Sequence, residues 1–128
     1  MKQLVQTICL LASAGLMLDA QTPFSTKTTD VMVRVIPKPG VQRELILKVM
    51  PDEVRATVRL YLEGKIRQWY SRSDGKGVIL IVNATSVADA QTVIDTLPLS
   101  KATLVEDEYT ELGPLAPMYN LIAPNAPR

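Results

Sequence analysis

Glu53, Arg34 and Arg67 are the side chains best suited by type and position to act on a carbonyl compound. Glu53 lies near the start of a predicted helix, and each arginine lies in a predicted strand. A positioned carboxylate can remove a proton next to a carbonyl, and guanidinium groups can stabilise the enolate that forms. The set predicts a proton-transfer site in which Glu53 is the catalytic base and Arg34 and Arg67 bind the substrate.

Each of these residues also has a structural interpretation. Carboxylates are common in the first turn of a helix, where they stabilise its positive end, and Glu53 suits that role. Charged side chains beside an apolar core need partners, so Arg34 and Arg67 are either paired structurally or available to an anionic ligand. The sequence leaves both interpretations open.

The residue types that are missing narrow the chemistry further. The chain has no histidine, and its one cysteine, Cys9, lies in the N-terminal apolar segment. Zinc sites, haem sites and the usual catalytic triads depend on these side chains, so we expect none of them. A net charge of +1 lacks the basic excess typical of nucleic-acid-binding proteins, so we expect no nucleic-acid partner.

Four segments have strand patterns. Residues 31–36 and 78–82 are rich in β-branched and apolar side chains. Residues 66–72 form another candidate strand, and the Asp74-Gly75 step that follows is typical of a hairpin turn. A last strand is expected over residues 102–112, where most of the acidic side chains suit a solvated sheet edge.

Two segments have helical patterns. Proline favours the first turn of a helix and glycine favours its end, so we expect one helix from Pro51 to Gly64, with residues 41–50 unassigned. A second helix should begin at Ser86, because Asp89 follows it at the spacing of a capping box. Pro98 is expected to end this second helix.

The order of these elements predicts an α+β protein with the ferredoxin-like β-α-β-β-α-β arrangement, an antiparallel sheet with two helices on one face. Residues 78–82 are apolar on both sides, so the second face of the sheet also needs cover. We therefore expect a homodimer, or a larger homo-oligomer, that pairs sheet to sheet. Trp69 should lie in the core, in this interface or in a substrate pocket.

The two ends of the chain differ in composition from the predicted domain, which covers residues 30–113. Residues 1–20 have the pattern of a signal peptide, so we expect a secreted or periplasmic protein with no membrane association after cleavage. Residues 21–29 are expected to form a flexible leader. Residues 114–128 are expected to form a proline-rich tail without regular structure.

About half of the chain resembles the muconolactone delta-isomerase family, whose members are dimeric α+β barrels. The most specific part of the resemblance is Leu-Pro-Leu at the end of the second helix, followed by a strand that contains an acidic residue. The matching positions are Asp52-Glu53, Arg59-Leu60, Glu63-Gly64, Arg67, Leu97-Pro98-Leu99 and Glu106.

The resemblance implies subunits paired sheet to sheet and a pocket between the sheet and its helices. It also implies cofactor-free isomerisation of a small lactone or a related aromatic-derived acid, with Glu106 among the substrate-binding residues. Two family positions differ here, because Gln68 replaces a histidine and Ser71 replaces a second arginine. A non-catalytic binding module and a structural oligomer on the same fold are the alternatives.

Overall fold

The structure, a computed structural model, describes residues 26–115. The signal peptide predicted for residues 1–20, and most of the predicted leader and tail, lie outside the described residues. In chain order the elements are β1 (Asp30–Pro37), α1 (Arg43–Leu62), β2 (Ile66–Ser71), β3 (Val78–Val82), α2 (Val87–Ile94), α3 (Pro98–Lys101) and β4 (Val105–Leu112).

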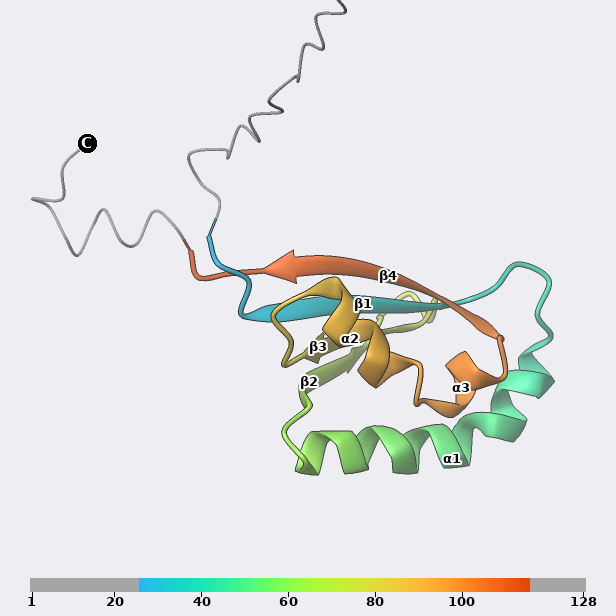
Figure 1. The fold of residues 1–128 in the computed structure, drawn as a ribbon. Helices are drawn as coiled ribbons and strands as arrows, with labels where there is room; N and C mark the ends of the chain where they lie inside the picture. Colours follow the sequence, from blue (N-terminus) through green and yellow to red (C-terminus); the bar gives the residue numbers. More distant parts are fainter. Residues whose placement is uncertain (1–25, 116–128) are drawn as a thin grey trace, which may run out of the picture.

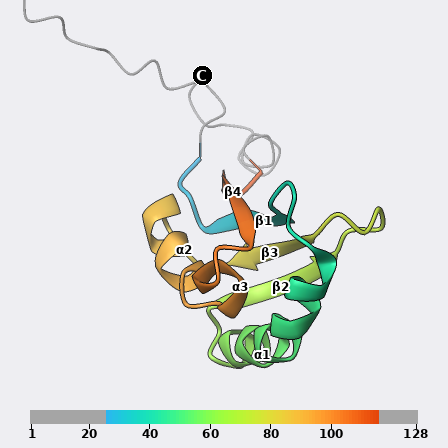
Figure 2. The same ribbon diagram turned by 90° about the vertical axis from the view of Figure 1, so that its right-hand side faces the viewer.

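The four strands form one antiparallel sheet in the order β2-β3-β1-β4. The helices lie together on one face of this sheet, with the long helix α1 running beneath it (Figures 1 and 2). The predicted α+β class and antiparallel sheet are therefore confirmed, and the arrangement is compatible with a ferredoxin-like fold.

The hydrophobic core lies between the sheet and the helices. Val31, Val33 and Val35 alternate along β1 and are at most 5% exposed, because successive strand side chains point to opposite faces. On the helix side they meet Ile94 and Leu97, which are almost fully buried. Burying each such side chain stabilises the folded state by about 1.5–3 kcal/mol. This stabilisation fixes which residues of the strand point toward the helices.

Within residues 26–115 no helix covers the other face of the sheet, which we call the open face. The pairing of the strands places the side chains of the open face next to one another across β4, β1, β3 and β2. Its members include Met32, Arg34, Ile36, Gln68, Tyr70, Ile79, Ile81, Glu106 and Glu108.

Helix α1 begins at Arg43, well before the predicted start at Pro51. Proline inside a helix removes a backbone hydrogen bond and favours a bend, and Figure 1 shows α1 bending along its length. Packing of Ile46 and Val49 against the core offsets that loss. The prediction was wrong because proline was read as a start signal, and Glu53 consequently lies within the helix rather than in its first turn.

The second helical segment is divided in two. The Ser86 side chain caps α2 as predicted, accepting a hydrogen bond of 3.1 Å from the Asp89 amide. Helix α2 ends at Ile94, however, and Pro98 begins the unpredicted short helix α3 instead of ending a longer one. Proline has no amide hydrogen to leave unpaired there, which makes it suitable for this first position.

The hairpin turn between β2 and β3 approaches β1 closely at Gly77. Its φ is +114°, and a Cβ atom there would lie 2.1 Å from the Val35 carbonyl oxygen. Only glycine permits this approach, so Gly77 sets the position of the adjacent Val78 against the end of β1.

Candidate functional site

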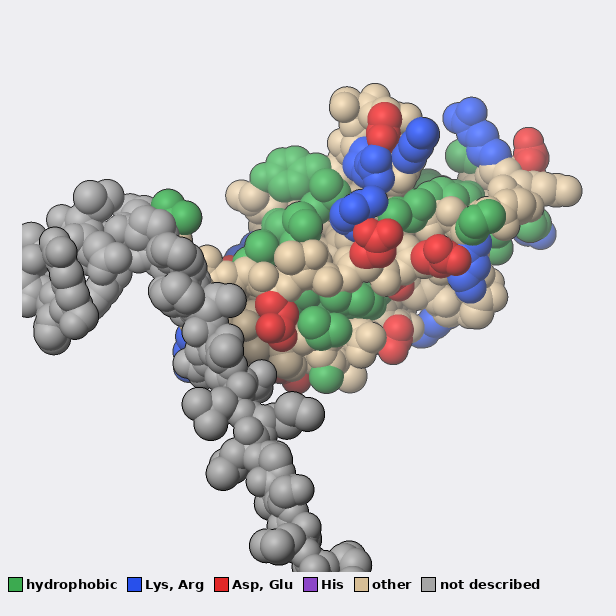
Figure 3. All heavy atoms as spheres, turned by 90° about the horizontal axis from the view of Figure 1, so that it is seen from above, with side chains coloured by type: hydrophobic (Ala, Val, Ile, Leu, Met, Phe, Trp, Pro, Cys, Tyr) green, Lys and Arg blue, Asp and Glu red, His purple; other side chains and the backbone are tan. Residues whose placement is uncertain are grey.

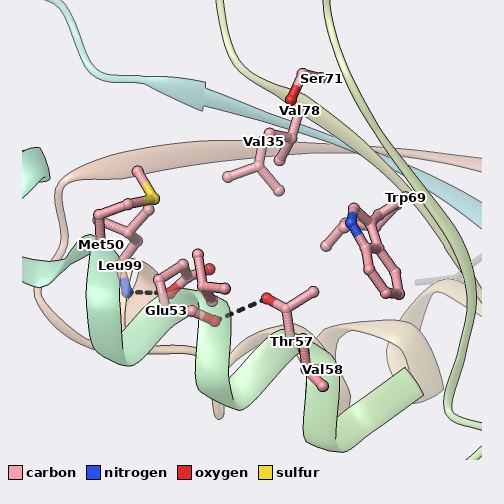
Figure 4. A pocket seen from close by; sticks show the side chains of 11 residues that line it. Val35, Met50, Glu53, Thr57, Val58, Trp69, Ser71, Val78 and Leu99 are labelled. Carbon is pink, nitrogen blue, oxygen red and sulfur yellow. Dashed lines mark hydrogen bonds between the residues drawn. The ribbon is translucent and has the colours of Figure 1, made fainter. Parts of the chain in front are cut away.

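A cavity of about 220 Å³ lies between α1 and the helix-facing side of the sheet. Figure 4 shows side chains from α1 on one side and from β1, β2 and β3 on the other. Most of the lining is aliphatic, and the polar contributions come from a carboxylate, two hydroxyls and an indole. The lining residues are Val35, Met50, Glu53, Val54, Thr57, Val58, Trp69, Ser71, Val78, Leu80 and Leu99.

The open end of the cavity carries exposed hydrophobic side chains. Val54 is 52% exposed and Val58 is 38% exposed. Trp69 comes from the edge strand β2, and its ring meets Tyr61 edge-on with centroids 4.7 Å apart. In Figure 4 the indole nitrogen of Trp69 faces the cavity, so the tryptophan side chain is placed to contact a bound molecule.

Glu53 is the one acidic side chain that residues 26–115 contribute to the lining, and it reaches from α1 to α3. Its Oε2 accepts a hydrogen bond of 2.8 Å from the Leu99 amide (Figure 4). Burial raises the pKa of Glu53 above its ordinary value of 4.5, and the nearby Asp107 carboxylate raises it further, whereas the Leu99 hydrogen bond lowers it. Desolvation has the largest effect, so Glu53 holds its proton to higher pH than an exposed glutamate.

Asp107 is a second inward-facing carboxyl group on β4. Its Oδ2 accepts a weak hydrogen bond of 3.4 Å from the Ser100 hydroxyl, while its buried Oδ1 has no hydrogen-bond partner among residues 26–115. Burial raises its pKa, the Ser100 hydrogen bond lowers it, and Asp95 raises it. Burial, with Asp107 close by, also raises the pKa of Tyr109 to about 12.

The inward-facing Asp107 carboxyl group is a feature that the sequence analysis missed. The acidic strand was interpreted as a solvated edge, but β4 alternates, and Asp107 follows buried Val105 by two residues. This alternation with a period of two residues was the signal in the sequence that could have identified Asp107 as inward-facing. The contact between Glu53 and the Leu99 amide had no comparable signal, because the two residues are distant in sequence.

The two predicted substrate-binding arginines lie away from the cavity. Arg34 is on the open face and forms an ion pair with Glu108, with 3.1 Å between nitrogen and oxygen. Arg67 forms an ion pair with Asp30 and donates a hydrogen bond of 2.9 Å to Asn83 Oδ1. Both arginines have partners, as a structural role requires.

Strand alternation explains this placement. Val35 points to the helices, so its neighbour Arg34 must point to the open face. A register irregularity between Ile66 and Gln68 sets Arg67 at the bulge in β2. Glu106 is exposed on the open face opposite Ile36. Of the predicted site residues, the structure brings Glu53 and Trp69 to one cavity and leaves Arg34, Arg67 and Glu106 outside it, so the predicted grouping of Glu53 with the two arginines is corrected.

Two kinds of feature are absent from residues 26–115. No group of three or more acidic, histidine or cysteine side chains there is arranged to hold a metal ion. None of the helices in the same part of the chain combines the length and the hydrophobicity needed to cross a membrane.

Comparison of the sequence with protein-family models gave no match, and no curated protein matched it either.

The raised pKa of Glu53 predicts how Glu53→Gln affects stability. Because the folded state binds the Glu53 proton more tightly than the unfolded state, the wild type loses stability as the pH rises from 4.5 through the folded-state pKa. Glutamine at this position does not titrate, so the variant has no such loss of stability. Its side-chain oxygen can still accept a hydrogen bond from the Leu99 amide. The free energy of unfolding of Glu53→Gln minus that of the wild type should therefore increase from pH 4 to pH 8, measured by urea denaturation.

Glu44→Gln is the matched control for that experiment. Glu44 lies in the exposed first turn of α1 and does not line the cavity, so the same exchange at Glu44 should not reproduce the effect of Glu53→Gln. A difference for Glu53→Gln that stays flat or decreases with pH would contradict the prediction.

Proposed function

We propose that this protein binds a small, largely apolar organic molecule in the cavity between α1 and the sheet. The observation that carries the proposal is the half-buried Glu53 carboxylate, placed among aliphatic side chains with Trp69 at the open end. Burying a carboxyl group costs free energy, and a hydrogen-bonding ligand offers compensation. Apolar surroundings with a few placed polar groups are typical of ligand pockets.

The size of the cavity limits the ligand. Its volume of about 220 Å³ is below the ~300 Å³ at which pockets for drug-sized ligands begin. A protein cavity of ~150 Å³ holds a benzene molecule, so the present volume suits one ring with a short substituent. A lactone or a single aromatic ring meets this limit.

Cofactor-free proton transfer is the second candidate function, in line with the resemblance to muconolactone delta-isomerases. The raised pKa of Glu53 favours it, because an acid–base catalyst works best with a pKa near the operating pH. Arg34 and Arg67 lie outside the cavity, so the Trp69 indole N–H and the Ser71 hydroxyl are the side-chain donors of the lining that could meet a developing oxyanion. Ligand binding without turnover remains the first proposal for this reason.

The open face supports a second part of the proposal, a homodimer with the ferredoxin-like subunits paired sheet to sheet. Met32, Ile36, Ile79 and Ile81 are only partly buried there, and Figure 3 shows hydrophobic side chains among charged ones on the side opposite α1. A second copy would remove this apolar surface from water. Sedimentation equilibrium should then give a dimer for the wild type and a monomer for Ile79→Lys, and a monomeric wild type would contradict the proposal.

We also propose that the protein is exported, as a secreted or periplasmic protein, with residues 1–20 removed. The proposal rests on the charged residue Lys2, the apolar run that follows it, and Ala20 at the expected cleavage point. Mass spectrometry of the protein from its host should find an N-terminus at Gln21, and a retained Met1 would contradict cleavage.

The fluorescence of Trp69 provides a direct binding test, because Trp69 is the one tryptophan of the chain and lines the cavity. A panel of small lactones, phenols and aryl alcohols should include compounds that change its emission and saturate. Thr57→Phe places a large ring in the cavity and should weaken binding about tenfold or more, since it occupies the ligand volume.

Thr92→Phe is the matched control for Thr57→Phe. Each threonine lies in a helix and donates a hydrogen bond to the carbonyl oxygen four residues earlier, but Thr92 is exposed on α2 and does not line the cavity. The control should bind like the wild type. Equal affinity for Thr57→Phe and the wild type would contradict the proposed site.

Glu53→Gln tests the catalytic candidate. If Glu53 removes the substrate proton, the variant should lose nearly all isomerisation of a small unsaturated lactone, because an amide cannot accept that proton. Lactone-dependent Trp69 fluorescence should remain in the variant and show that it still binds. Unchanged turnover in a folded Glu53→Gln protein would eliminate Glu53 as the base.

A further inference from the structure

We infer that the cavity selects ring-sized molecules that carry a hydrogen-bond donor, such as an alcohol, a phenol or an amine, and rejects carboxylates of the same size. This inference rests on the proposed ligand-binding function and names the chemical class of its ligand. It differs from the anionic ligand that the arginines in the sequence suggested.

The charge of the cavity lining disfavours an anionic ligand. Glu53 is the one charged side chain among the residues that line the cavity, and within the described part of the chain no lysine or arginine lines it. Asp107 adds a second carboxyl group close enough to raise the pKa of Glu53. The arginines with which a carboxylate ligand might pair, Arg34 and Arg67, are paired with Glu108 and Asp30 instead.

The hydrogen bonds around Glu53 determine which ligand group its carboxylate can meet. Leu99 donates its amide hydrogen to Glu53 Oε2, and the Thr57 hydroxyl donates at 2.9 Å to the Glu53 carbonyl oxygen. Both donors at this end of the cavity are therefore engaged within the protein. A carboxylate has about four lone-pair positions, so Glu53 still has capacity to accept. A ligand group that meets Glu53 must supply a hydrogen.

The opposite end of the cavity accommodates the rest of the molecule. The Trp69 ring and the aliphatic side chain of Val58 provide apolar contact area for a ring. Figure 4 places Trp69 across the cavity from Glu53. A ring carrying one donor group can therefore contact the indole side while its donor faces the carboxylate.

A carboxylate ligand would meet opposite conditions. It would lose its hydration in an apolar cavity, gain no cation there, and lie near a carboxyl group of the same charge. At low pH, where Glu53 and the ligand are both protonated, this repulsion disappears. Rejection of carboxylates should consequently weaken as the pH falls.

The test compares benzyl alcohol, benzylamine and benzoate as probes of similar size, with binding followed by Trp69 fluorescence at pH 7.5. Benzyl alcohol or benzylamine should bind at least about tenfold more tightly than benzoate, since a charge-assisted hydrogen bond is replaced by repulsion. In Glu53→Gln this preference should decrease to about threefold or less, because the amide removes the negative charge and can donate to benzoate. Glu44→Gln, the same change at an exposed position of α1, should keep the wild-type preference.

The outcomes separate the inference from the function on which it rests. Benzoate binding as tightly as benzyl alcohol and benzylamine would overturn the inference while leaving the ligand-binding function supported. A preference that is unchanged in a folded Glu53→Gln protein would also overturn it. If none of the three probes changes Trp69 fluorescence, and the panel of lactones and phenols also fails, the proposed function is overturned and the inference with it.

Discussion

The hydrogen bond from the Leu99 amide to the Glu53 carboxylate is the contact on which the candidate site depends. Helix α3 has no side-chain cap of its own, and Glu53 takes that place from the middle of α1. Caps of this kind are worth about 0.5–2 kcal/mol, which helps to hold a carboxyl group in an apolar interface. The same contact ties α1 to the segment that leads into β4, so the cavity beside Glu53 has a fixed wall.

The alternation of the strands divides the charged residues between two surfaces. On the helix side the sheet presents valines, Leu80 and the acidic side chain of Asp107, and on the open face it presents Arg34 paired with Glu108. Arg34 and Arg67 are therefore kept from the cavity, while Glu53 lines it and Asp107 lies close to Glu53. This distribution makes a donor-bearing ligand a better complement than an anion, and it leaves the open face with the mixed apolar and charged character of an interface surface.

Much of the fold could be predicted from the sequence, because strand composition, the Asp74-Gly75 turn and the Ser86 cap are local signals. The start of α1 could not be, since tertiary packing of Ile46 and Val49 outweighs the local preference of Pro51. Glu53 and Trp69 were identified as site residues, but the arginines were grouped with them without regard to strand alternation. Only the three-dimensional structure shows that the partner of Glu53 is a backbone amide of another helix.

A ligand that enters the cavity should meet Glu53. A nuclear magnetic resonance titration with benzyl alcohol can follow the Leu99 amide, the Trp69 indole N–H and the amides of the open face. The Leu99 and Trp69 signals should shift together with one dissociation constant, because both residues line the cavity, while the Arg34 and Ile79 amide signals stay in place. Shifts confined to the open face, with the Leu99 signal unmoved, would contradict binding in the cavity.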